Sequence, residues 1–304
     1  MKNKDFYKEM KLQEQKKRSA GDESTADLYR AAGNHFKRFN NGRELSLKDI
    51  TPTMVYAFVE WLREKGLRTN SVNSYLSNLR AMYHRACRSW KGKPQDSPFA
   101  GLHLRQEETL KRAAPAKVIK QIASLDLKAE PKKQLAADLA LFSFMACGMP
   151  FVDVVHLTRE NLIENGKVLT YNRQKTGALI QIEVTVGMQF LIDRYSRPGE
   201  RYLFPVLPEN ATHEQYKCCL ARQNEFLEEI GKLLNWDGKL TTYVFRHSWA
   251  SEAYHSHVPI SIISQALGHT SEKMTHVYLQ SFSAKEVGKA VKQVAEKVEL
   301  LLKG

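Results

Sequence analysis

The segment Leu240–Ser281 constrains the fold more than any other stretch, because it combines helix signals with an unusual density of hydrogen-bond donors. Pro259 suits the first turn of a helix, and apolar residues then recur at helical spacing up to Leu267. Gly268 is a helix stop signal, so His269 is expected in a loop just past a helix end. A structural core segment would not need so many donors with so few acidic partners.

Three features of this segment resemble the second half of a tyrosine recombinase active site. They are Arg246, the Leu-Gly-His triplet Leu267–His269, and Tyr278 nine residues after that histidine. The family usually has a histidine three residues before the arginine, whereas this chain has Tyr243 there. A tyrosine at this position is usual in the Bacteroides-type integrases, which the segment resembles most closely. The resemblance covers the catalytic domain well and the N-terminal domain loosely.

The resemblance implies a role for each matching residue. Tyr278 would be the nucleophile that attacks phosphorus and holds the DNA strand covalently. Arg246 would bind two phosphate oxygens through its planar fork of donors, and His269 would donate a hydrogen bond to the same phosphate. Tyr243 would stand in place of the usual histidine. Lys175, in a turn between two predicted strands, would be the general acid for the leaving oxygen.

Each of these residues also has a plainer interpretation. A lone tyrosine on an amphipathic helix is usually a core aromatic, a lone arginine is usually a surface charge, and lysines are common in turns. The offsets between Arg246, His269 and Tyr278 favour catalysis, whereas Lys175 depends on the resemblance alone. His247 is expected to be structural, although it is next to Arg246.

The first arginine of the family pattern has no counterpart at its usual place. That place aligns with Pro150, and the residue before Gly148, an arginine in many Bacteroides-type relatives, is Cys147. Losing one donor to a developing anionic charge costs a factor on the order of 10²–10³ in rate. The chain must therefore supply another donor or lose activity.

Arg173 is the best candidate substitute. Strand alternation predicts that it lies on the same face as Lys175, two residues further on. Arg159 is a weaker candidate and is expected to be a surface charge. Asp153 occupies the position of the family's acidic residue and is expected to support the arginines by orienting them.

The bulk composition limits the kind of protein. A chain of 304 residues is long enough for two cores, and a formal net charge of +13 favours a polyanionic partner. Nucleic acid is favoured over an anionic membrane, because no apolar run approaches a membrane span and no signal peptide is visible. The spacing of Cys87, Cys147, Cys218 and Cys219 suits neither a zinc site nor a disulfide framework. These observations predict a cytoplasmic protein of the bacterial nucleoid.

The pattern of apolar residues predicts a mainly α fold with a small β-hairpin, and the resemblance implies a two-domain clamp on DNA. Residues 1–22 are expected to be a charged extension, either a frayed helix or a DNA-tracking arm. Residues 23–105 are expected to form a helical, SAM-like core DNA-binding domain, and residues 106–282 the catalytic domain. The hairpin is predicted within residues 167–184.

One block of the helical domain carries charge of a single sign. It holds eight basic residues against one acid, Glu64, and solvated helix faces usually mix signs. The block predicts phosphate contacts, with plain solubility as the alternative. Its members are Arg63, Lys65, Arg68, Arg80, Arg85, Arg88, Lys91 and Lys93.

Residues 283–304 are predicted to be a C-terminal helix. Ser283–Glu286 is a capping box, and the apolar residues that follow have a 4-3-4-3 spacing up to Leu301. The helix either folds back on its own core or docks into a neighbouring subunit. The resemblance favours docking.

The leading hypothesis is a site-specific DNA recombinase, an integrase or invertase, that works through a 3′-phosphotyrosine intermediate and strand exchange. It would bind double-stranded DNA with inverted-repeat half-sites and form a homo-tetramer on two duplexes, with accessory DNA-bending proteins as further partners. Integration or excision of a mobile element and DNA inversion all fit. This chemistry needs no metal and no other cofactor. The alternatives are a catalytically weak DNA-binding homologue and a type IB topoisomerase.

Overall fold

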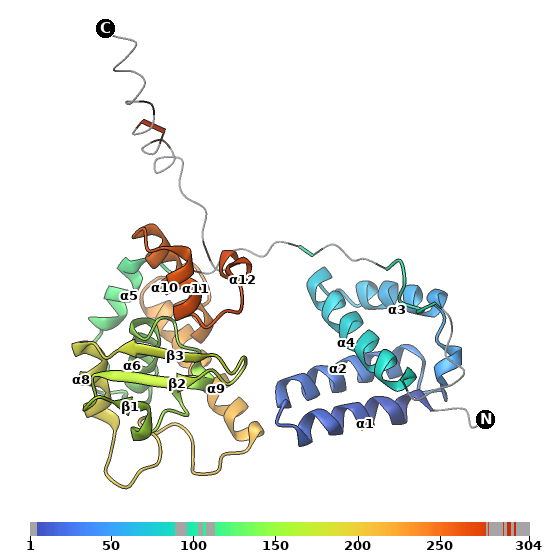
Figure 1. Ribbon diagram of the computed structural model, residues 1–304, viewed down its shortest axis with the longest axis horizontal. Helices are drawn as coiled ribbons and strands as arrows, with labels where there is room; N and C mark the ends of the chain where they lie inside the picture. The colour runs from blue at the N-terminus through green and yellow to red at the C-terminus, as the bar shows by residue number, and fades with distance from the viewer. Residues whose placement is uncertain are drawn as a thin grey trace. The chain divides into compact units, whose positions relative to one another are not determined.

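The computed structural model describes residues 5–88, 96–102, 106–107, 113–277 and 279, together with 288, 291, 292 and 295 in the tail. The chain divides into two compact units, Met1–Thr109 and Leu110–Gly304 (Figure 1). Both units are mostly helical, and a three-stranded antiparallel sheet lies in the second. The predicted mainly α fold with a small β element is confirmed. No helix in the described part of the chain is long and apolar enough to cross a membrane.

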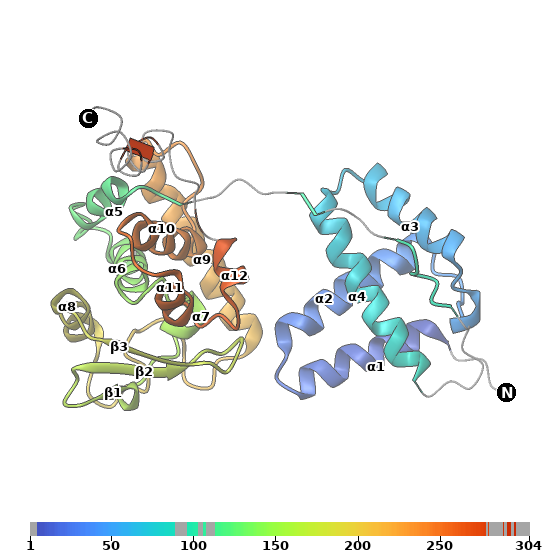
Figure 2. The ribbon, with the colours of Figure 1, turned by 45° about the horizontal axis from the view of Figure 1, so that its top comes forward.

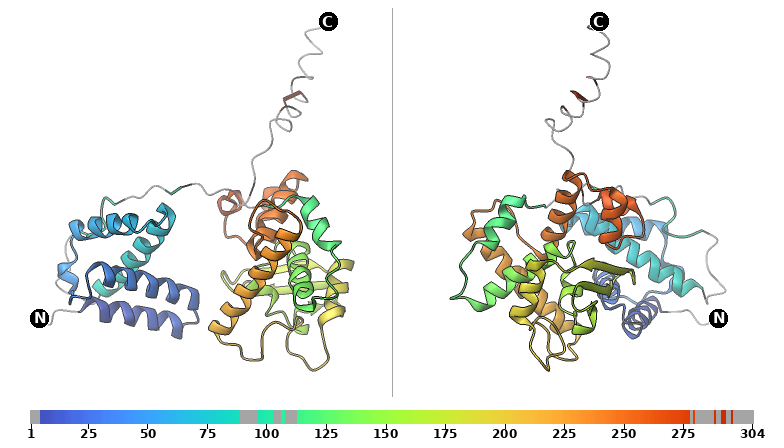
Figure 3. Two further views of the ribbon diagram at one scale, coloured as in Figure 1. Left: turned by 180° about the vertical axis from the view of Figure 1, so that it is seen from behind. Right: turned by 60° about the vertical axis from the view of Figure 1, so that its left-hand side comes forward.

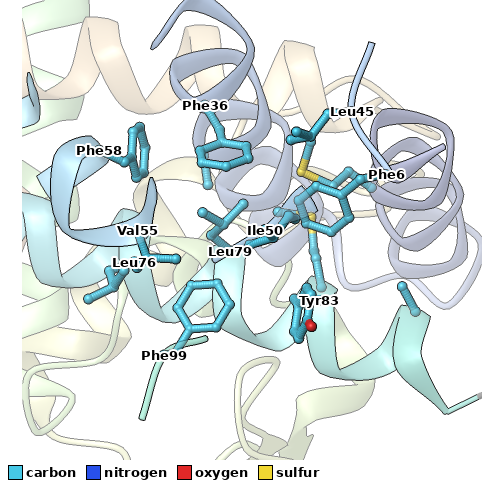
Figure 4. Close-up of a cluster of buried hydrophobic side chains, with 14 of the residues drawn as sticks. Phe6, Phe36, Leu45, Ile50, Val55, Phe58, Leu76, Leu79, Tyr83 and Phe99 are labelled. Atoms are coloured by element: carbon cyan, nitrogen blue, oxygen red, sulfur yellow. The ribbon is translucent and has the colours of Figure 1, made fainter. Parts of the chain in front are cut away.

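The N-terminal unit is built on helices that bury one aromatic-rich core. Phe6, Phe36, Phe58 and Tyr83 point into the same space from different helices (Figure 4). Two of these helices begin at a side-chain cap: Asp5 before α1 and Thr51 before α3 each accept hydrogen bonds from backbone N–H groups of the helix that follows. The α-helices of this unit are α1 (Phe6–Ser19), α2 (Glu23–Phe39), α3 (Pro52–Glu64) and α4 (Thr69–Cys87).

The prediction that residues 1–22 form a separate charged extension is wrong for α1. Phe6 and Met10 are buried in the core of the N-terminal unit, and the Phe6 N–H donates to the Leu45 carbonyl at 2.8 Å. Arg18 forms ion pairs with three carboxylates, two of which belong to α2. The charged residues occupy the outer face of an amphipathic helix, and the few apolar positions on the other face hold it in the domain.

The second unit surrounds one helix, α6 (Pro131–Met145), against which the four longest of the other described helices of this unit pack (Figure 2). Those helices are α5 (Ala116–Ala123), α8 (Val186–Tyr195), α9 (His213–Leu233) and α10 (Thr242–His255). The remaining short helices are α7 (Phe151–Val154), α11 (Ile260–Ala266) and α12 (Glu272–His276). Helices α10, α11 and α12 gather at one end of the unit, and α11 packs against a strand (Figure 3).

The sheet has the strand order β1-β2-β3, with β1 (Leu162–Ile163), β2 (Val168–Asn172) and β3 (Leu179–Glu183). The predicted hairpin is confirmed, since β2 and β3 pair antiparallel with Tyr171 opposite Ile180. The short strand β1 was not predicted, because two residues are too few to show alternation. After Pro150 the chain forms a single helical turn, α7, and leaves it soon after Asp153.

The predicted C-terminal docking helix, residues 283–304, lies outside the described residues except at 288, 291, 292 and 295. It stays a prediction.

Candidate active site

Two arginines converge on one backbone oxygen at the Leu-Gly-His turn. The Leu267 carbonyl accepts a hydrogen bond from Arg246 Nη2 at 2.6 Å and another from Arg173 Nη1 at 2.7 Å. Arg246 comes from α10 and is 3% exposed; Arg173 follows β2 and is 7% exposed. Two like charges this close in a buried site create a strong preference for an anion between or beside them.

Two glycines allow the arginines to lie against the backbone. Gly148 has φ +66°, and a Cβ there would lie 2.7 Å from the Arg246 Cα. Gly268 has φ +63°, and a Cβ there would lie 2.5 Å from the Arg173 Cδ. Arg246 Nη1 also donates to the Gly148 carbonyl at 3.0 Å. Glycine is thus required at both positions by conformation and by space.

Asp153 lies beside Arg173 at the start of the hairpin turn. Its Oδ1 accepts from the Gln174 N–H at 3.0 Å, and its Oδ2 is 3.5 Å from Arg173 Nε. Burial raises the pKa of the Asp153 carboxyl, against the opposing effects of the Gln174 N–H and the Arg173 charge. Among the described residues, neither Asp153 Oδ2 nor Arg173 Nε has a hydrogen-bond partner. The two groups face each other in a long ion pair, so the carboxylate orients the Arg173 guanidinium toward the Leu267 carbonyl.

The imidazole of His269 lies between Arg246 and Thr275. Its Nε2 is 3.1 Å from Arg246 Nη2, and its Nδ1 is 2.9 Å from Thr275 Oγ1. A guanidinium only donates, so Nε2 accepts and Nδ1 carries the proton of the neutral ring. Burial, helped by the charges of Arg246, Arg173 and Lys175, lowers the pKa of His269 to about 4. The ring is neutral at pH 7.

Lys175 and Tyr243 are exposed, unlike the arginines. Lys175 lies in the turn between β2 and β3, and its charge acts on His269. Tyr243 is 52% exposed, one helical turn before Arg246 on α10, and its ring lies 4.8 Å from that of His247.

The prediction that Arg173 and Lys175 share one face by strand alternation is wrong. Strand β2 ends at Asn172, so both residues lie in the turn, where alternation does not apply. Arg173 points into the protein and Lys175 is exposed to solvent. Arg173 nevertheless reaches Arg246, because the turn carries it toward the Leu267 carbonyl.

Cys147 lies where an arginine was looked for. It has φ +57° and is half-buried. Burial raises its pKa to about 11 despite the nearby charge of Arg246. Its thiol is therefore uncharged at neutral pH and supplies no cation. Pro150, the other candidate place for the missing arginine, caps α7. Arg159 is exposed, as expected, in a short 3₁₀ turn.

Tyr278 lies outside the described residues. The residues that flank it are described: α12 ends at His276, and Leu279 is 5% exposed, packed with Ile263 and Leu267 in a small apolar cluster. Thr275 is fully buried. Thr275 was not among the predicted site residues, although its place three residues before Tyr278 was a usable signal.

The described residues of the basic block are spread along the N-terminal unit. Helix α4 has 19 residues, so its two ends are about 28 Å apart. Arg63, Lys65 and Arg68 are exposed near its beginning, and Arg88 is exposed at its end.

Two other members of the basic block, Arg80 and Arg85, contact groups within their own domain. Arg80 donates to the Leu102 carbonyl at 3.2 Å and lies 5.9 Å from the centre of the Phe99 ring, so it is used within the domain. Arg85 is half-buried, 5.8 Å from the centre of the Tyr29 ring. Lys91 and Lys93 lie outside the described residues.

Comparison with known proteins agrees with this geometry. Residues 115–285 match the phage integrase family, and residues 5–100 match the phage integrase SAM-like domain. Tyrosine recombinase XerD of Pseudomonas aeruginosa is 21% identical over 263 residues, which cover 84% of this chain and 86% of that protein.

Two solved structures show the same fold. The Tn1549 transposon integrase in complex with transposon right end DNA has a TM-score of 0.66 at 13% identity, covering 95% of this chain and 99% of that one. The XerH site-specific recombinase bound to a palindromic difH substrate has a TM-score of 0.62 at 16% identity, covering 90% of this chain and 79% of that one.

Because the catalytic family match spans more than half of the chain, the protein belongs to the phage integrase family, the tyrosine recombinases. It is a site-specific recombinase, an enzyme that breaks and rejoins DNA. The family and the class of activity predicted from the Arg246, Leu267–His269 and Tyr278 pattern are confirmed.

Proposed function

We propose that Arg173 and Arg246, at the Leu267 carbonyl, bind the scissile phosphate and that Tyr278 attacks it. The observation that carries this proposal is the convergence of Arg173 and Arg246 on one carbonyl oxygen, with His269 beside them. A nonbridging phosphate oxygen bears more charge than a carbonyl, so the guanidinium groups exchange one acceptor for a stronger one.

Each step of the reaction breaks one phosphoester bond and forms another, so their number does not change. The Tyr278 hydroxyl gives its proton to a solvent water as its oxygen attacks phosphorus, which forms a bond to the tyrosine oxygen and breaks the bond to the 5′ oxygen. Lys175, exposed at the hairpin turn, gives a proton to that leaving oxygen. The released 5′ hydroxyl of a partner strand then attacks the 3′-phosphotyrosine and frees Tyr278. His269 and Tyr243 donate hydrogen bonds to the phosphate.

A nicked suicide DNA substrate tests this assignment. The nick lets the strand end diffuse away after cleavage, so the covalent protein–DNA adduct accumulates. Wild type forms the adduct, and Tyr278→Phe does not. If neither protein forms an adduct, the chain is the catalytically weak DNA-binding homologue that Cys147 and Pro150 suggest. Relaxation of plasmids without a target site would instead indicate a type IB topoisomerase.

Arg173 replaces the missing first arginine. Its burial, its bond to the Leu267 carbonyl and its ion pair with Asp153 support this role. Arg173→Ala should lower adduct formation by a factor on the order of 10²–10³. Arg159→Ala is the matched control, because Arg159 is exposed and should have no effect. Near-normal cleavage by Arg173→Ala would contradict the substitution.

The N-terminal unit contacts the DNA backbone through its exposed cations. Of the basic block, Arg63, Lys65, Arg68 and Arg88 are exposed, whereas Arg80 and Arg85 are held by neighbouring groups. Exposed cations contribute affinity without reading sequence. The protein would act on chromosomal DNA in the nucleoid.

The protein acts as a tetramer on two duplexes with inverted half-sites, with accessory DNA-bending proteins as optional partners. The apolar 4-3-4-3 spacing of residues 287–301 supports a subunit-docking role for the tail. Truncation before Ser283 should abolish cooperative binding to paired half-sites and leave single half-site affinity unchanged. Unchanged cooperativity would exclude the tail as the docking element. Inverted repeats beside the gene would distinguish DNA inversion from integration of a mobile element.

A further inference from the structure

We infer that Thr275 is the positioning residue for His269: its hydroxyl orients the imidazole and follows it from one tautomer to the other. This inference rests on the proposed role of His269 at the phosphate. Thr275 lies in α12, three residues before Tyr278, and its side chain is 0% exposed. Its Oγ1 is 2.9 Å from His269 Nδ1.

The contacts of His269 explain why a hydroxyl is needed. Without DNA, Arg246 Nη2 donates to His269 Nε2 at 3.1 Å, so the ring proton is on Nδ1 and is donated to Thr275. A ring that donates from Nε2 to a phosphate oxygen must carry its proton on Nε2 instead. Its Nδ1 is then an acceptor. Because a hydroxyl both accepts and donates, Thr275 can pair with Nδ1 in either form by rotating its O–H.

The charged surroundings keep the ring neutral and make the tautomer the relevant variable. Arg246 faces His269 from α10, and Arg173 and Lys175 act on it from the hairpin. With burial they lower the pKa of His269 to about 4, so one nitrogen alone carries a proton at neutral pH. A carboxylate in place of Thr275 would favour the imidazolium, whereas a hydroxyl leaves the ring free to change tautomer.

Thr275 also joins His269 to the segment that bears the nucleophile. Thr275 and Leu279 are both buried and lie on either side of Tyr278 in sequence. Leu279 packs with Ile263 and Leu267, the residues that lead into the Leu-Gly-His turn. The segment is thus anchored by an apolar contact after Tyr278 and by a polar contact before it. The polar contact makes the orientation of His269 depend on the placement of α12.

Two variants distinguish the effect of the Thr275 hydroxyl on cleavage from the effect of the side-chain shape. Thr275→Val keeps the volume and removes the hydroxyl, and Thr275→Ser keeps the hydroxyl. On the suicide substrate at saturating DNA, Thr275→Val should cleave about tenfold more slowly, because His269 loses its orientation, and Thr275→Ser should restore most of the rate. Half-site affinity should be unchanged for both.

A matched control and a double variant exclude a merely structural effect. Thr270 also lies next to His269 in sequence, but it is exposed and its Oγ1 contacts only the Met274 sulfur at 3.5 Å among the contacts described. Thr270→Val should cleave like wild type. In a His269→Gln background, Thr275→Val should cause no further loss, since the residue acts through the ring. A further tenfold loss there would overturn the inference.

The tautomer can be measured without DNA. Histidine ¹⁵N shifts at pH 7 should show the proton of His269 on Nδ1 in wild type and in both variants, because Arg246 fixes Nε2 as an acceptor. The Nδ1 shift should move in Thr275→Val, where the hydrogen bond to the hydroxyl is lost, and should stay near the wild-type value in Thr275→Ser. The resonance is assigned by its loss in His269→Gln. If Thr275→Val keeps the wild-type Nδ1 shift and the wild-type rate, the inference is wrong. If wild type forms no adduct, the proposed function fails, while the ¹⁵N comparison still decides the role of Thr275.

Discussion

The two units use their positive charge in opposite ways. In the catalytic unit, Arg173 and Arg246 are almost fully buried and bonded to carbonyl oxygens, and two glycines make room for them. In the N-terminal unit, Arg63, Lys65 and Arg68 are exposed, and Arg63 is paired with Glu60 of its own helix. Buried cations are fixed before the substrate arrives, whereas exposed cations are mobile and screened by salt.

The difference teaches that the charge of +13 serves two separate purposes. In the proposed function, the buried arginine pair would concentrate two charges on a single phosphate, where they can act on the transition state. The exposed cations would act on many phosphates of the duplex, and their contribution would fall as salt rises. Variants in the two units should therefore separate rate from affinity.

The largest effect is expected from Arg246. Arg246→Ala removes the donor to the Leu267 and Gly148 carbonyls and to the phosphate, and should lower single-turnover cleavage by a factor on the order of 10²–10³. Arg246→Lys should recover little, because an ammonium cannot replace the planar fork. Thermal unfolding of each variant checks that the unit is folded at the assay temperature. Full recovery by lysine would show that charge alone suffices.

A smaller loss is expected from Gly268→Ala. The new Cβ would lie 2.5 Å from the Arg173 Cδ and must displace that side chain, in addition to about 1–2 kcal/mol of backbone strain at φ +63°. Cleavage should fall at least tenfold with unchanged half-site affinity. Gly199→Ala is the control, because φ is +86° there and nothing lies within 4 Å of a Cβ. Equal losses in both variants would assign the effect to backbone strain.

In the N-terminal unit, salt dependence should change and the cleavage rate should not. The double variant Lys65→Ala, Arg68→Ala removes two exposed cations and should lower the slope of log K against log salt by about 0.9 for each phosphate contact. Adduct formation at saturating DNA should stay as in wild type. Arg80→Ala is the contrast: its bond to Leu102 predicts a lower unfolding temperature and an unchanged salt slope. An unchanged slope in the double variant would remove these residues from the interface.

The smallest effect is a pH dependence of stability from His269. Its pKa in the folded protein is about 4, below the 6.5 of an ordinary histidine, so between these values the unfolded chain binds a proton that the native state does not. The contribution of neutral His269 to the free energy of unfolding is fully present above pH 6.5 and is lost as pH falls toward 4. Denaturant unfolding of wild type and His269→Gln should therefore converge as pH falls through this window. Parallel curves would contradict the lowered pKa.

Much of the catalytic unit could be predicted from local patterns. Pro259 and Gly268 bound the short helix α11 and its turn, and the spacing from Arg246 to Tyr278 indicated the family. The hairpin was visible because alternation persists over ten paired residues. Helix α1 was misjudged, since its many charges concealed the few apolar residues that anchor it.

The sequence by itself determined the residue types and spacings of the recombinase motif, because helix caps, turns and offsets along one helix depend on neighbours in the chain. Only the tertiary structure decided which cations meet. Arg173 and Leu267 are 94 residues apart, and whether a turn arginine points inward depends on the space that Gly268 leaves and on the Asp153 carboxylate. Likewise, the residues of the basic block are close in sequence, but those at the two ends of α4 lie far apart in space, because a helix extends about 1.5 Å per residue.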